Sequence, residues 1–144
     1  MPLLYSDITE KIIGCAMKVH GKMKNGYTEA VYQKCLAIEL KKININFLQE
    51  ADIGIYYENI VVGRRRVDFL IEDKIAVELK AVSELTDAHL AQALNYLETN
   101  RLEVGLLINF GAKSLQFKRL INQHKPVDLH NPANPIQNQI NPRS

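Results

Sequence analysis

Two stretches with the apolar spacing of helices open the chain. Apolar residues recur every three to four positions over residues 7–22, and again from Tyr27 or Thr28 to about Lys42, which predicts two amphipathic helices. The first stretch opens with Asp7-Ile8-Thr9-Glu10, the spacing of a capping box. Residues 24–26 (Lys-Asn-Gly) favour a break between the two helices.

From residue 46 the apolar pattern changes to that of strands. Residues 47–57 and 61–71 are expected to be extended, with a turn at residues 58–59, and residues 75–81 form a short, mostly apolar segment that suits a central strand. A turn at residues 72–74 joins the last two segments. Three apolar residues of the second segment are expected to share one face because strand side chains alternate: Val67, Phe69 and Ile71.

A third helix and two further strands complete the pattern. Thr86 or Asp87 is expected to begin a helix that ends near Thr99, and Leu90, Leu94 and Leu97 form its apolar stripe. Residues 104–108 are wholly apolar and 115–121 can form a last strand. Residues 122–144 are rich in Asn, Gln and Pro, which predicts a loosely held or disordered tail.

The order of these elements predicts a fold class. Two helices, three strands, a helix and two strands favour an α/β domain in which an antiparallel meander is followed by a helical crossover. The expected architecture is a mixed central sheet flanked by helices, formed by residues 1–121 as one domain. A chain of 144 residues is long enough to bury a core of this kind.

Composition narrows the class of protein. Hydrophobic residues make up 47% and charged residues 24%, as in ordinary globular proteins. No apolar run approaches the roughly 18 residues of a membrane span, and the N-terminus lacks the pattern of a secretory signal. Cys15 and Cys35 lie in helical patterns and are expected to be reduced. We therefore expect a cytoplasmic protein with no membrane attachment.

Charge is informative mainly where it clusters. A net charge of +2 is low for a protein that binds nucleic acid without sequence preference, since such affinity comes from phosphate neutralisation. Arg64, Arg65 and Arg66, however, stand together just before Asp68. The cluster forms either a solvated surface or a contact to phosphate groups. Alternation along the strand predicts that Arg65 faces away from the other two.

Three residues on neighbouring strands form the strongest candidate for chemistry. Alternation places Glu78 and Lys80 on one face of their strand. If the turn at 72–74 has three residues, Asp68 lies opposite Glu78 on that face, whereas a two-residue turn places it opposite Val77. Two close carboxylates repel unless a cation neutralises them, and oxygen ligands suit Mg²⁺ or Mn²⁺.

A metal ion at this place would activate a water molecule as the nucleophile that hydrolyses a phosphodiester bond. Mg²⁺ polarises a phosphoryl oxygen and lowers the pKa of a bound water, and Lys80 beside it can orient that water or help to deprotonate it. The alternative is a structural network of ion pairs among Asp68, Glu78 and Lys80.

Two helices carry further candidates. His89, Gln92 and Tyr96 share one face of the third helix, opposite its leucines. Gln92 and Tyr96 either reach the metal-bound water or a phosphate group, or they belong to an ordinary polar helix face. We expect His89 to lie on the helix surface. Glu29, in the first turn of the second helix, either stabilises the helix dipole or supplies a third carboxylate.

Together these positions resemble the PD-(D/E)XK nuclease superfamily, including the Q-x-x-x-Y element of its exonuclease branch. More closely, the chain is similar to the small GxxExxR family over residues 6–121. The similar stretches are residues 12–14 (IIG), 26–32 (GYTEAVY), 67–70 (VDFL), 77–81 (VELKA) and 106–111 (LLINFG). Two positions depart from the pattern. Val67 stands where the motif name has Pro, and Tyr32 stands where the family name has Arg.

The resemblance implies a restriction-endonuclease-like core of αβββαβ order with an extra N-terminal helix, and it implies a set of roles. Asp68 and Glu78 would bind the metal, with the Leu79 carbonyl and Glu29 as further ligands. Lys80 would be the catalytic lysine, supported by Gln92 and Tyr96. We add phosphate contact by Arg66 and Arg64 as an expectation of our own.

Three functions are compatible with these residues. The first is a Mg²⁺-dependent nuclease that hydrolyses phosphodiester bonds, with DNA favoured over RNA. The second is a nucleic-acid-binding or adaptor module that retains the fold without cutting, and the third is a structural domain whose charges form ion pairs. Because the chain is small and weakly basic, a nuclease of this kind would need a homodimer, a partner protein, or a preference for single strands and ends.

Overall fold

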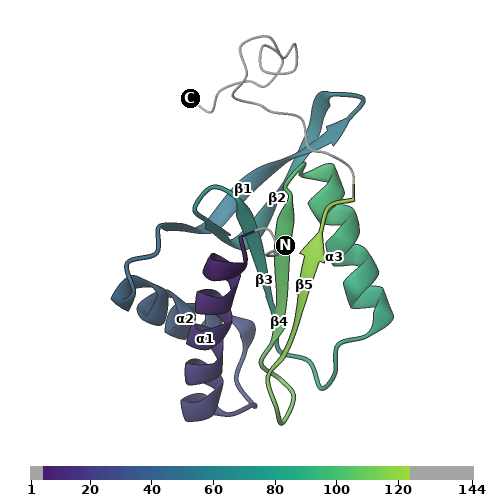
Figure 1. Ribbon diagram of the computed structural model, residues 1–144. Coiled ribbons are helices and arrows are strands. Elements are labelled where there is room, and N and C mark those ends of the chain that lie inside the picture. The colour runs from purple at the N-terminus through teal and green to yellow at the C-terminus, as the bar shows by residue number, and fades with distance from the viewer. Residues whose placement is uncertain (1–4, 124–144) are drawn as a thin grey trace.

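The computed structural model describes residues 5–123, and Figure 1 shows its three layers. The elements run in the order α1 (Ser6–Met23), α2 (Glu29–Lys42), β1 (Phe47–Tyr57), β2 (Ile60–Ile71), β3 (Ile75–Lys80), α3 (Asp87–Thr99), β4 (Val104–Asn109) and β5 (Gln116–Ile121). This is the order expected from the apolar spacing, and the bounds lie within two residues of the expected ones.

The five strands form one mixed sheet in the order β1-β2-β3-β4-β5. β1, β2 and β3 are an antiparallel meander, β4 lies parallel to β3, and β5 returns antiparallel to β4. α3 is the crossover between β3 and β4, as a parallel pair requires. The predicted α/β class with a mixed sheet is therefore confirmed.

Helices cover both faces of the sheet: α1 and α2 lie on one side and α3 on the other (Figure 1). The main core joins α1 and α2 to the sheet through fully buried residues such as Ile12, Leu36, Val77 and Ile108. Burial of such side chains, at roughly 25 cal/mol per Å² of apolar area, is the dominant stabilising term. The β1–β2 hairpin projects beyond the layers (Figure 1).

Val67 departs from the expected face. Phe69 and Ile71 belong to the main core, but Val67, equally buried, packs in a smaller cluster with Ala51 and Ala76. The strand pair is irregular at this point. Glu50, which lies between the partners of Phe69 and Val67, has a φ of 53°, a left-handed conformation that interrupts the regular pleat. The irregularity lies directly opposite Asp68.

The prediction of a capping box at the start of α1 is wrong. The N-cap residue is Tyr5, with a φ of 55° and no side-chain cap, so Asp7 lies inside the first turn. There its carboxylate is still favoured by the helix dipole. A capping box is present instead at α3: the Thr86 hydroxyl accepts from the His89 backbone at 3.3 Å, and His89 Nδ1 accepts from the Thr86 backbone at 3.0 Å. His89 is thus a capping residue at the helix surface.

Two predictions concern the cysteines and the end of the chain. Cys15 is buried, Cys35 is partly buried, and neither forms a disulfide.

Asn122 is held by hydrogen bonds to the carbonyls of Glu103 at 2.9 Å and Leu102 at 3.0 Å. The rest of the predicted tail, from residue 124, lies outside the described residues. Within residues 5–123, no helix has the length and apolar character to cross a membrane.

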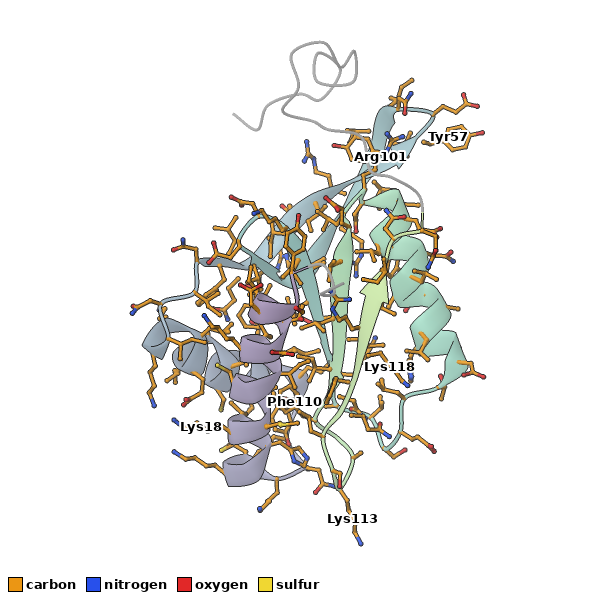
Figure 2. All side chains as sticks on the ribbon, viewed as in Figure 1. Lys18, Tyr57, Arg101, Phe110, Lys113 and Lys118 are labelled. Carbon is orange, nitrogen blue, oxygen red and sulfur yellow. The ribbon has the colours of Figure 1, made fainter. Side chains whose placement is uncertain are left out.

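Tyr32 fixes the connection between α1 and α2. Its side chain is fully buried and stacks on Phe110, with ring centroids 4.7 Å apart, and Figure 2 shows Phe110 between the sheet and α1. The Tyr32 hydroxyl donates to the Lys24 carbonyl at 2.6 Å and accepts from the Tyr27 backbone at 3.2 Å. Both ends of the loop are tied, which sets where α2 and Glu29 begin.

Replacement of this hydroxyl is expected to destabilise the fold. Tyr32→Phe keeps the stacked ring but leaves the Lys24 carbonyl and the Tyr27 N–H without this partner, which should lower the free energy of unfolding in urea by about 1–3 kcal/mol. Tyr57→Phe, at a ring that is 66% exposed on the hairpin, is the matched control and should change it by less than about 0.5 kcal/mol. Equal losses in both variants would show that the buried hydroxyl does not fix the loop.

Candidate active site

The three strongest candidates lie where the pairing of β2 with β3 stops. The turn between these strands has three residues, because Ile71 pairs with Ile75, and the paired register runs only to Phe69 and Val77. Asp68 and Glu78 are the next residues of the two strands. The three-residue turn on which the predicted register depended is thereby confirmed.

Asp68 has two hydrogen-bond donors that hold its carboxylate beside β3. One oxygen accepts from the Leu79 backbone N–H at 2.7 Å, and the other accepts from Gln33 Nε2 of α2 at 2.9 Å. Gln33 in turn accepts from Gln49 of β1 at 2.8 Å. The Asp68 carboxylate therefore accepts the hydrogen bond from Leu79 that a backbone carbonyl of β2 would otherwise accept. It does so where the regular pairing of β2 with β3 ends.

Glu78 has a different set of partners, on the side of α3. Its carboxylate forms an ion pair with Arg65, and the Arg65 guanidinium lies 3.9 Å from the centre of the Tyr96 ring. The side chains of Arg65 and Glu78 are only 17% and 21% exposed. Burial raises the pKa of the Glu78 carboxyl above its usual value, and the charge of Asp68 adds to that rise, while Arg65 and Lys80 act in the opposite direction.

The structure brings only some of the predicted residues together. Asp68 accepts from Gln33 of α2, whereas Glu78 pairs with Arg65 of β2, whose guanidinium lies over Tyr96 of α3. Glu29 and Gln92 are exposed on their helices. Within residues 5–123, no group of three or more His, Cys, Asp or Glu side chains is close enough to hold a metal.

Two residues that contact the carboxylates were not predicted as site residues. Gln33 lies four positions after Glu29 and thus on the same face of α2, which is a signal that the sequence carried. Arg65 was predicted only to face away from its neighbours. That is confirmed, since Arg64 and Arg66 are exposed while Arg65 reaches Glu78.

The donor atoms at the end of β3 are suited to a hard divalent cation. The Lys80 carbonyl accepts from the N–H of Phe110, directly after β4, and alternate residues of a strand turn their backbone groups to opposite neighbours. The Leu79 carbonyl therefore projects toward β2, like the Leu79 N–H that binds Asp68. Carboxylates of Asp68 and Glu78 with this carbonyl form an all-oxygen set, which Mg²⁺ and Mn²⁺ prefer. These donors fit such an ion by their chemistry, while the Asp68 carboxylate is held by Gln33 of α2 and the Glu78 carboxylate by Arg65.

Lys80 stands on a rigid strand end. Its carbonyl accepts from the Phe110 N–H at 2.9 Å. The fully buried Asn109 accepts from the backbone of Val82 at 2.9 Å and of Gly111 at 3.0 Å, and donates to the Val82 carbonyl at 2.9 Å. These bonds clamp the chain just beyond Lys80, so its ammonium moves relative to the strand only through the torsions of its own side chain.

This combination defines a class of domain. A mixed sheet with an acidic residue where β2 leaves β3, and an acidic residue and a lysine two positions apart on β3, is a restriction-endonuclease-like arrangement. The model of the PD-(D/E)XK nuclease superfamily matches residues 6–120. The chain belongs to that superfamily, whose members are usually nucleases and generally use divalent metals such as Mg²⁺.

No match is found among curated proteins. The crystal structure of SSO0001 is similar over 84% of this chain and 79% of that chain, at 16% identity and a TM-score of 0.43.

Proposed function

We propose that the chain is a metal-dependent nuclease that hydrolyses phosphodiester bonds of DNA. The observation that carries the proposal is the position of Asp68, Glu78 and Lys80 at the end of the β2–β3 ladder, within a chain of the PD-(D/E)XK superfamily. The alternative of a structural ion-pair network accounts less well for the presence of Lys80, because Glu78 pairs with Arg65 and not with Lys80.

Each residue has a proposed part in the reaction. Asp68, Glu78 and the Leu79 carbonyl would hold Mg²⁺ or Mn²⁺, and Glu29 would add a carboxylate from α2. The ion, when bound, polarises the phosphodiester and lowers the pKa of a water molecule. Lys80 would orient this water and stabilise the negative charge that develops on the phosphate. Gln92 and Tyr96 would support the site from α3.

The substrate would approach along β2. Arg64 and Arg66 are exposed on the strand that leads to Asp68, where they would contact phosphate groups. With a net charge of +2, few such contacts are available to one chain. We therefore favour a homodimer, a partner protein, or a substrate with single strands or ends. Membership of the narrower GxxExxR family is part of this proposal.

A comparison of substrates and metals tests the function. Purified protein is incubated with single- and double-stranded DNA and RNA, in Mg²⁺, in Mn²⁺ and in EDTA. We expect cleavage of DNA with either metal and none in EDTA, because the carboxylates alone provide no activated water. Undiminished cleavage in EDTA would contradict the proposal. Binding without cleavage in every condition would favour the non-cleaving nucleic-acid-binding module instead.

A further inference from the structure

Arg65 is the feature of the site that the proposed reaction does not use. It lies on β2, pairs in register with Ile53 of β1, and extends toward α3 to reach Glu78. Arg64 and Arg66 on either side are exposed, whereas the Arg65 side chain is only 17% exposed. A largely buried guanidinium beside a proposed metal ligand requires an explanation of its own, since burying an arginine is costly without compensation.

Two contacts compensate the Arg65 charge. The Glu78 carboxylate pairs with the guanidinium, and the face of the Tyr96 ring lies 3.9 Å from it. A cation over an aromatic ring is attracted by the ring quadrupole, most strongly where water is excluded. Arg65, Glu78 and Tyr96 line one small cavity between the sheet and α3. The contacts therefore hold Glu78 toward α3, away from the side on which Gln33 holds Asp68.

This arrangement leads to a proposal that rests on the proposed metal-dependent function. We propose that Arg65 is an internal competitor of the metal ion: it neutralises Glu78 and holds it toward Tyr96, and it must release Glu78 before that carboxylate can bind a metal. Before the metal binds, Tyr96 is then a positioning residue that acts through Arg65, and its proposed support of the site follows only after Arg65 has released Glu78. The exchange replaces one cation by another at the same buried carboxylate, so charge at Glu78 stays balanced in both states.

Metal affinity measured without nucleic acid tests this proposal. Mn²⁺ binding is followed by electron paramagnetic resonance or calorimetry for the wild type, Arg65→Ala and Tyr96→Leu. Removal of the competitor should tighten Mn²⁺ binding by about tenfold in Arg65→Ala, a typical size for coupled binding equilibria. Tyr96→Leu keeps both charges but removes the ring, so a smaller gain is expected.

A matched control separates competition from a general loss of positive charge. Arg101 also lies over a tyrosine, 5.0 Å from the Tyr56 ring, but at the projecting hairpin (Figure 2) and away from Glu78. Arg101→Ala should leave Mn²⁺ affinity unchanged. In the double variant Arg65→Ala/Glu78→Gln the gain should disappear, because the carboxylate for which Arg65 and the metal compete is gone.

The melting temperature of the variants, with and without Mn²⁺, is a second measurement. In EDTA, Arg65→Ala should melt below the wild type because Glu78 loses its partner, and saturating Mn²⁺ should raise its melting temperature more than that of the wild type. Unchanged or weaker Mn²⁺ binding in both Arg65→Ala and Tyr96→Leu would overturn the proposal, even if the wild type cleaves DNA. If neither the wild type nor these variants bind Mn²⁺, the proposed metal site and the competition both fail. Metal binding by the variants alone would support the competition.

Discussion

Lys80→Met should lower the rate of DNA cleavage by at least about 100-fold at saturating metal. The substitution keeps a long unbranched side chain and removes the ammonium that would orient the water and stabilise charge on the phosphate. Loss of one such preorganised group typically costs 10²–10³-fold in rate. The fold should survive, because the hydrogen bond that Lys80 makes to Phe110 uses the backbone carbonyl and not the side chain.

The measurement is a single-turnover cleavage rate, with Mn²⁺ affinity determined on the same preparation. Lys118→Met is the matched control, since Lys118 is exposed on β5 (Figure 2). This variant should cleave DNA at a rate within about twofold of the wild type. A loss shared equally by the two variants would point to general charge rather than to a catalytic lysine. A Lys80→Met protein that cleaves at the wild-type rate would remove Lys80 from the mechanism.

The fold was predictable because its signals are local. Apolar spacing separates helices from strands, and the wholly apolar stretch at 104–108 matches β4, which is buried along its length. The register of β2 and β3 was predictable only conditionally, because it depends on whether their turn has two or three residues, and the structure shows three. The capping box at the start of α1 was predicted wrongly because Asp7 and Glu10 have its spacing in the sequence, and only the backbone of Tyr5 shows that the helix begins at Ser6.

The candidate site was predictable only in part, for a different reason. Alternation identifies side chains on one strand, so it relates Glu78 to Lys80 and sets Arg65 apart from its neighbours. It does not show which donor meets which carboxylate. Gln33 is 35 positions from Asp68, and its contact depends on how α2 packs across the sheet. The left-handed backbone of Glu50, which alters the faces around Asp68, has no signal in the local sequence.

Among the seven glycines of the chain, Gly111 should lose the most stability when it is replaced by alanine. A Cβ at this position would lie 2.3 Å from the Val82 carbonyl oxygen and 2.5 Å from the Ala81 carbonyl carbon, which are backbone atoms. Relief requires the chain beyond β3 to move, yet Asn109 clamps it through hydrogen bonds to Val82. We expect a loss of about 3 kcal/mol in the free energy of unfolding.

Gly14→Ala is the matched control, because a Cβ there has no atom within 4 Å. It lies inside α1, where alanine is favoured over glycine by roughly 0.5–1 kcal/mol, so this variant should gain stability. Both are measured by urea denaturation. The displaced segment begins directly after Lys80, so Gly111→Ala should also slow cleavage under conditions where the protein remains folded. If Gly111→Ala is as stable as the wild type, the end of β3 yields more easily than its hydrogen bonds imply, and the precise placement of Lys80 must come from elsewhere.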